Sequence, residues 1–146
     1  MDLLTAIKIS ASGLSAQRLR LNVLSSNLAN ANSTRNADGT GPYQRKDPIF
    51  EEVSAKEFEK ALDKADRHLS GVKVTDVVTD QKAGPRVYDP SHPDADKDGF
   101  VQLPNVNPVT ELTDIMATSN AYEANVAAIR SARDMINAAL SLGRDS

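Results

Sequence analysis

Apolar residues recur in alternating steps of three and four along the first 31 residues of the chain. The series is Leu3, Ile7, Ser10, Leu14, Gln17, Leu21, Leu24, Leu28 and Ala31. Ile7, Leu14, Leu21 and Leu28 are spaced by seven, and such a repeat keeps one narrow stripe facing a partner helix. We therefore expect a long N-terminal helix within residues 1–34, ended by the Asn-, Ser- and Gly-rich residues 29–42.

The C-terminal part of the chain, residues 107–146, repeats the same pattern. Its series is Leu112, Ile115, Ser119, Tyr122, Val126, Ile129, Arg133, Ile136 and Leu140. We expect a second long helix, which Asn107 or Thr110 would cap at its start and Gly143 at its end. Two helices that bury only one stripe each need further apolar contact, which other chains would supply.

Residues 35–106 combine several short elements. Ser54 and Glu57 form a capping-box pair at the start of residues 54–69, which predicts a short helix. Val-rich residues 71–80, followed by residues 85–90 and 99–104, predict three strands separated by Gly and Pro. The expected fold class is mainly α: long N- and C-terminal helices pair as a coiled-coil-like hairpin, with a linker, the short helix and a small β insertion between them.

Composition narrows the class of protein. The 146 residues are about one domain's worth, with 40% hydrophobic and only 4% aromatic residues. The absence of cysteine excludes disulfides, thiolate zinc sites and cysteine nucleophiles. The net charge of −3 argues against nucleic acid as a partner. Residues 1–50 carry +3 and residues 51–146 carry −6, which favours contact between the two parts of neighbouring subunits unless both are simply solvated.

Neither a membrane span nor a cleavable secretory signal is expected. No apolar run approaches the length of a transmembrane helix. The first residues place Asp2 ahead of an interrupted apolar stretch, unlike a signal peptide. We expect a chain that is soluble when made, does not insert directly into a membrane, and leaves the cytoplasm, if it does, without a cleaved peptide.

No catalytic constellation is evident, so an enzyme is not expected. His68 and His92 have no further ligands at metal-binding spacing. Ser91 is adjacent to His92, and neighbouring side chains do not supply nucleophile–base geometry. We expect no cofactor.

An aspartate ladder precedes the last predicted strand. Asp94, Asp96 and Asp98, followed by Gly99, match the opening of a calcium-binding loop. The twelfth position, however, is Asn105 where such a loop needs a bidentate Glu, and no exiting helix is predicted. A turn stabilised by Asp side chains is therefore favoured, and the three aspartates remain weak candidates for metal ligands.

Two segments resemble the signatures of bacterial flagellar rod and hook proteins. Residues 10–34, in particular Ser26-Asn27-Leu28-Ala29-Asn30, resemble the N-terminal signature of this family. Residues 107–126, which contain Asn120-Ala121-Tyr122-Glu123-Ala124-Asn125, resemble its second signature. Residues 71–107 are similar to those of proximal-rod members. Asn120 stands where the family usually has Arg, and Leu112 and Ile115 replace methionines. Residues 51–69 are less typical of the family.

The resemblance implies a structural subunit of the basal body whose terminal helices form an axial core in a periplasm-spanning, torque-transmitting rod. It implies as partners other rod proteins, further copies of the chain, the MS-ring adaptor protein and the flagellar type III export apparatus. Two alternatives remain at this point: a calcium-binding regulatory module and a free helical-hairpin adaptor.

The pattern then assigns roles to individual residues. We expect a helix–helix seam and subunit interface formed by Ile7, Leu14, Leu21, Leu24, Leu28, Ile115, Tyr122, Val126, Ile129 and Ile136. Asn27, Asn30 and Asn125 are candidates for polar contacts that fix the register of the seam. Alternatively, Asn30 only ends the first helix and Asn125 faces solvent.

Overall fold

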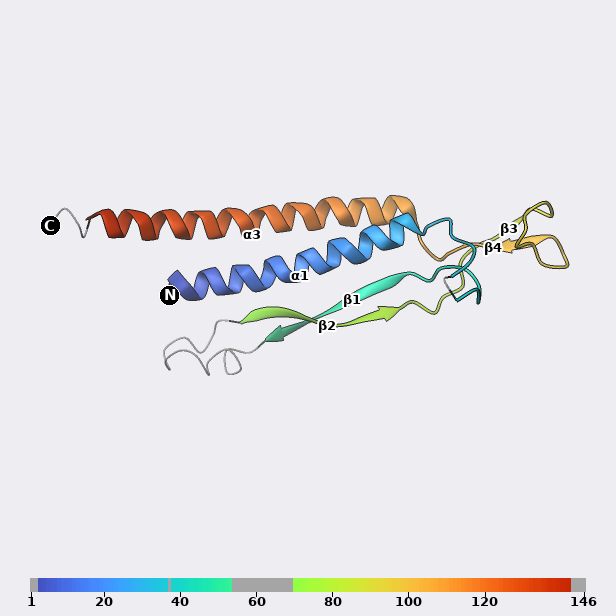
Figure 1. Cartoon of the computed structure of the whole chain (residues 1–146), viewed down its shortest axis with the longest axis horizontal. Helices are drawn as coiled ribbons and strands as arrows, with labels where there is room; N and C mark the ends of the chain where they lie inside the picture. The colour runs from blue at the N-terminus through green and yellow to red at the C-terminus, as the bar shows by residue number, and fades with distance from the viewer. Residues whose placement is uncertain (1–2, 37, 54–69, 143–146) are drawn as a thin grey trace. The chain divides into compact units, whose positions relative to one another are not determined.

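A computed structural model describes residues 3–36, 38–53 and 70–142 of the chain. Helix α1 (Leu3–Ala29) begins the described chain and helix α3 (Pro108–Leu142) ends it (Figure 1). Between them lie β1 (Lys46–Val53), β2 (Gly71–Thr79), β3 (Arg86–Tyr88) and β4 (Phe100–Gln102). The predicted class, mainly α with a small β part between terminal helices, is confirmed. The short helix predicted over residues 54–69 and the capping residue Gly143 lie outside the described residues.

The chain divides into two compact units, and each long helix contributes to both. Among the described residues, the first unit comprises residues 3–19, 49–53, 70–76 and 118–142. The second unit comprises residues 20–36, 38–48 and 77–117. Each unit therefore combines parts of α1, α3 and the strands.

The strands form two separate two-stranded sheets. β1 pairs with β2, and β3 pairs with β4 in an antiparallel ladder that places Val87 opposite Val101 and Tyr88 opposite Phe100. Strands β2, β3 and β4 fall within the three segments predicted to be strands. β1 was not predicted, because Pro48 and the acidic pair Glu51–Glu52 interrupt the alternation that normally signals a strand.

The start of α3 is capped by Asn107. Its Oδ1 accepts hydrogen bonds from the backbone N–H groups of Val109 at 3.0 Å and Thr110 at 3.4 Å. Pro108 then occupies the first helical position, where its missing N–H leaves no bond unmade. Of the two predicted caps, Asn107 is correct and Thr110 is not, because Thr110 already lies inside the helix.

The cores of the two units differ in the size of their buried residues. Among the described residues of the first unit, the most fully buried side chains are small: Ala16, Thr118 and Ala132 are 4%, 3% and 4% exposed. Gly13 belongs to the same surface, since a Cβ atom there would lie 3.2 Å from the Asn125 side chain. The second unit buries larger side chains, namely Val23, Leu24, Tyr43, Val101 and Pro104. Among the described residues, large apolar burial is therefore concentrated in the second unit.

Two backbone segments pack closely at Gly84, just before β3. A Cβ atom at this position would lie 2.1 Å from the backbone oxygen of Leu103, a clash that no side-chain rotation relieves. We expect Gly84→Ala to lower the free energy of unfolding by more than about 2 kcal/mol, measured by urea denaturation. Gly39→Ala is the matched control. It meets no atom within 4 Å, so only its positive φ should cost stability, about 1 kcal/mol. Equal effects of the two substitutions would contradict this packing.

Candidate functional site

The ten seam residues differ in burial between the two units. In the second unit, Leu24 is 1% exposed, whereas Leu21, Leu28 and Ile115 are half-buried. The remaining six residues all lie in the first unit and all are half-buried: Ile7, Leu14, Tyr122, Val126, Ile129 and Ile136. In the single chain, the seam positions of the first unit thus keep part of their apolar surface accessible to water.

Two members of the C-terminal stripe are mostly exposed. Leu112 and Leu140 have 52% and 63% of their surface accessible. A straight α-helix drifts by about 20° per heptad relative to a seven-residue repeat, so residues at the two ends of a long stripe rotate away from a common face. α3 therefore carries accessible apolar side chains outside the seam as well.

Asn27 is the most completely hydrogen-bonded side chain of the candidate interface. It is fully buried near the end of α1. Its Nδ2 donates to the backbone oxygen of Lys46 at 2.8 Å and to Oε2 of Glu111 at 3.1 Å. Its Oδ1 accepts from the backbone N–H of Lys46 at 3.0 Å and from the Tyr43 hydroxyl at 2.9 Å. A carboxamide has two donor hydrogens and two acceptor lone pairs, and all four are used here.

These bonds join three segments of the second unit. Asn27 lies on α1, Lys46 begins β1, and Glu111 lies in the first turn of α3. Asn27 bonds both the N–H and the C=O of Lys46, which is how a neighbouring strand would pair with that residue. We call this set of contacts the Asn27 anchor.

Glu111 extends the anchor and is itself fully buried. Its Oε1 accepts a hydrogen bond from Nε of Arg45, which also pairs with Asp47. Its place in the first turn of α3 is favourable for a negative charge. Burial lowers the pKa of Arg45, but the hydrogen bonds and charges of Glu111 and Asp47 together outweigh burial, so the pKa lies above its ordinary value. Sequence reasoning did not single out Tyr43, Arg45 or Glu111, because their partners are distant in the chain.

The other two predicted register residues make local hydrogen bonds. Asn30 donates to the backbone oxygen of Ser26 at 2.8 Å and accepts from Ser33 at 3.2 Å, at the end of α1. Asn125 donates to the backbone oxygen of Ala121 at 3.1 Å within α3. Asn125 is half-buried and lies against Gly13.

The Asp-rich turn between β3 and β4 is held by its own aspartates. Asp96 Oδ1 accepts from the backbone N–H groups of Asp98 at 3.0 Å and Phe100 at 2.9 Å, and its Oδ2 pairs with Arg86. Gly99 has a φ of +81°, and a Cβ atom there would lie 2.9 Å from the Tyr88 ring, so glycine is required.

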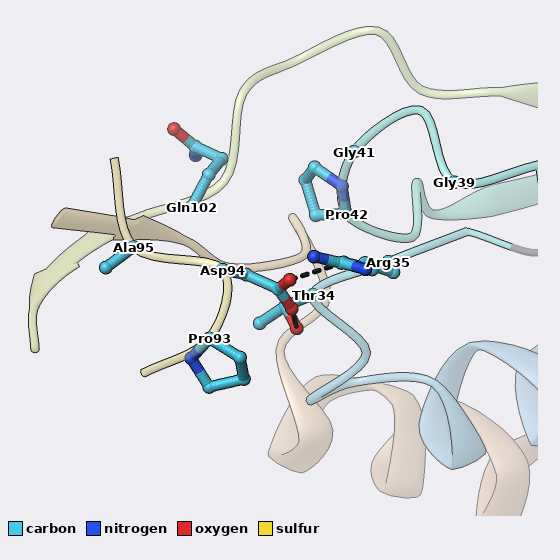
Figure 2. Close-up of a pocket in the computed structure, with 9 residues that line it drawn as sticks. All are labelled: Thr34, Arg35, Gly39, Gly41, Pro42, Pro93, Asp94, Ala95 and Gln102. Atoms are coloured by element: carbon cyan, nitrogen blue, oxygen red, sulfur yellow. Dashed lines mark hydrogen bonds and ion pairs between the residues drawn. The ribbon is translucent and has the colours of Figure 1, made fainter. Parts of the chain in front are cut away.

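Asp94 connects this turn to the loop that follows α1. Figure 2 shows its carboxylate directed toward the hydroxyl of Thr34 and the guanidinium of Arg35. The Thr34 hydroxyl donates at 2.7 Å. The three residues belong to the lining of a pocket of about 340 Å³ in the second unit. Asp94 thus fixes the turn against residues 34–35.

The contacts of the turn favour its structural interpretation over calcium binding. Asp94 and Asp96 direct their oxygens to protein donors, and His92 Nδ1 accepts from the backbone N–H of Asp94 at 3.1 Å. Within the described residues, no group of three His, Cys, Asp or Glu side chains is placed to hold a metal ion. His68 lies outside those residues.

Across the same described ranges, no helix has the length and apolar character needed to cross a membrane.

Two family models match the chain: one covers most of α1 and the other covers all of α3. The model described as flagella basal body rod protein matches residues 7–37. The model described as the C-terminal part of the flagellar basal body rod FlgEFG proteins matches residues 97–142. Asn27 lies in the first matched segment and Glu111 in the second, so the hydrogen bond between them joins the two.

Curated relatives match along nearly the whole chain. The flagellar basal-body rod protein FlgC of Borreliella burgdorferi is 40% identical, over 97% of this chain and 98% of the relative. FlgC of Bacillus subtilis is 38% identical, over 95% and 97% of the two chains. FlgC of Escherichia coli O6:H1 is 39% identical, over 99% and 100%.

The two long helices and these matches define a structural protein of the bacterial flagellum rather than an enzyme. More specifically, the chain belongs to the flagellar basal-body rod protein family, among relatives named FlgC. It is a structural subunit of the proximal rod of the basal body, where rod proteins assemble with one another.

Replacing Asn27 tests the anchor. In Asn27→Ala, the Tyr43 hydroxyl and one oxygen of Glu111 lose a partner in a buried place, and the N–H and C=O of Lys46 lose one in a partly buried place. We expect the free energy of unfolding to fall by about 3 kcal/mol. Asn30→Ala, which removes only local bonds, should cost less than about 1 kcal/mol. If chemical denaturation gives similar losses for both variants, Asn27 does not anchor the fold.

Acid should weaken the Asp-rich turn. The backbone N–H of Phe100 lowers the pKa of Asp96, and the Thr34 hydroxyl lowers that of Asp94, both from an ordinary value of 3.8. The unfolded chain therefore binds these protons at higher pH than the folded chain does. Their stabilisation is complete above pH 3.8 and is lost as pH falls through the lowered values. When the free energy of unfolding is measured by urea denaturation from pH 7 to pH 2, it should fall less steeply with acid in Asp96→Asn than in the unsubstituted chain. An unchanged decline would contradict this assignment.

Proposed function

We propose that the chain polymerises through its two terminal helices, whose seam residues complete their burial against neighbouring rod subunits. The observation that carries this proposal is the half-burial of all six seam residues in the first unit. Partly buried Leu, Ile and Val side chains each have further transfer free energy to gain from burial, up to about 1–2 kcal/mol. Assembly would supply that burial, because the single chain does not.

The charges of the helices favour contact between unlike helices, and such contact can form between subunits as well as within one. α1 carries Lys8, Arg18 and Arg20 and no acidic residue. α3 carries the acidic residues Glu111, Asp114, Glu123 and Asp134 against the basic residues Arg130 and Arg133, a net charge of −2. Opposite net charges favour the approach of α1 to α3, both within one chain and between subunits, and disfavour pairs of like helices.

Within this proposal the segments take the roles expected from the sequence. Residues 1–34 and 107–146 would form the axial core of the rod, and residues 35–106 would lie between them. Asn27, Asn30 and Asn125 would fix the register of the helices. The Asn27 anchor supports such a role for Asn27, because its partner Glu111 lies on the other helix.

The remaining partners follow from the resemblance to rod proteins. We propose that the chain contacts the MS-ring adaptor protein as well as other rod subunits and that the flagellar type III export apparatus delivers it. In this scheme the rod crosses the periplasm and transmits torque to the parts of the flagellum beyond it. Relatives named as basal-body rod proteins support this location.

Charged substitutions in the seam test the proposed polymerisation. We expect Leu21→Asp or Ile129→Asp to abolish rod assembly and swimming when the chain replaces the corresponding rod protein of a motile bacterium. A carboxylate at either half-buried position would have to be desolvated in the assembled rod. Soluble subunit should still accumulate, as measured by immunoblotting.

Conservative substitutions provide the control. Leu21→Met and Ile129→Val keep an apolar side chain at the same positions and should preserve swimming. Normal motility of either aspartate variant, with that variant present in isolated basal bodies, would contradict polymerisation through the seam.

A further inference from the structure

A ridge of apolar side chains lies on α3 outside the predicted seam. Val109, Leu112 and Met116 are spaced by three and four residues, so they share one face of the helix. They are 74%, 52% and 63% exposed. Glu111, in the same turns, is fully buried in the Asn27 anchor, so the ridge occupies a different face of α3. We call these three residues the α3 ridge.

An apolar groove lies in the first unit between α1 and β2. Its volume is about 320 Å³. Its floor and walls come from Ser12, Ser15, Ala16 and Leu19 of α1 and from Val72 and Val74 of β2. Leu19 and Val72 are 38% and 41% exposed, so the groove offers accessible apolar surface. We call it the α1–β2 groove.

Hydrogen bonding keeps the two walls of the groove together. The Ser12 hydroxyl donates to the backbone oxygen of Ile9 at 2.7 Å and accepts from the backbone N–H of Val72 at 3.2 Å. Gly71 permits this approach, since a Cβ atom there would lie 3.0 Å from Ser12 Oγ. The groove is therefore formed before any partner binds.

We infer that the α3 ridge of one subunit docks in the α1–β2 groove of a second copy of the same chain. The small residues Ser12, Ser15 and Ala16 leave room for side chains the size of leucine and methionine. Lys73 lines the groove, and the charged residues of the adjoining helix α1 are all basic, whereas Asp114, between Leu112 and Met116 of the ridge segment, is acidic. Charge and apolar surface thus favour the same pairing.

A contact between two different surfaces of the same chain can be repeated from copy to copy. Ridge and groove are different surfaces, so each copy presents both and still has one surface free after binding a neighbour. Such heterologous contacts continue into helical assemblies unless the rotation between copies closes a ring. The inference rests on the proposed polymerisation and identifies one pair of surfaces through which copies meet.

Cross-linking between engineered cysteines tests the contact, since the sequence contains no cysteine. Two tagged copies, one carrying Met116→Cys and the other Val72→Cys, would be expressed together in a bacterium that lacks its own rod protein of this family. Isolated basal bodies would be treated with a short thiol-reactive cross-linker. We expect a cross-linked dimer that contains both tags.

A matched pair provides the control. Met135→Cys places a thiol at a position of α3 that is 53% exposed but outside the ridge. Combined with Val72→Cys, it should give no dimer. Absence of the dimer from the ridge–groove pair, equal yields from the two pairs, or cross-linking of Met116→Cys to a different rod protein would overturn the inference.

The same experiment separates the inference from the proposed function. If both tagged copies enter basal bodies and support swimming but do not cross-link, the ridge–groove contact is wrong and polymerisation through the helices stands. If the unmodified chain fails to enter basal bodies at all, the proposed function fails and the inference fails with it.

Discussion

The fold of the second unit depends on one fully buried carboxamide. Asn27 has no contact with water, and each of its donors and acceptors is paired within the protein. A buried polar group is tolerated only when it is hydrogen-bonded, and it then permits few alternative arrangements. Because its partners lie on α1, β1 and α3, a shift of any one of these elements would leave buried groups unpaired. The anchor thus specifies the arrangement of the second unit more sharply than apolar packing alone would.

The first unit has no comparable anchor among its described residues. Its most fully buried described side chains are small, and its large apolar residues on α1 and α3 are half-buried or exposed. Fewer buried apolar contacts mean lower local stability. The chain therefore combines a second unit that specifies its own structure with a first unit whose apolar positions are available to partners. This division suits a rod subunit, which has to fold as a single chain and then gain stability from its neighbours.

The sequence predicted those features that rest on local periodicity. The heptad spacing of Ile7, Leu14, Leu21 and Leu28 predicted α1 within a few residues, and the Val-rich, partly alternating residues 71–80 predicted β2. β1 was missed because its pairing with β2, rather than its own pattern, makes it a strand. The Asn27 anchor was predicted only in part. Asn27 was singled out, but its partner Glu111 is 84 residues away, and nothing in a single sequence links the two.

Amide hydrogen exchange of the free subunit and of assembled rods tests the central claim most directly. The account predicts that amides of the second unit around Asn27 are protected in both states. Amides of the first-unit helices, near Leu14 and Ile129, should exchange rapidly in the dilute subunit and become protected in the rod. Equal and strong protection of both units in the dilute, monomeric subunit would contradict the account. The first-unit helices would then already be fully protected, and assembly would add no further protection.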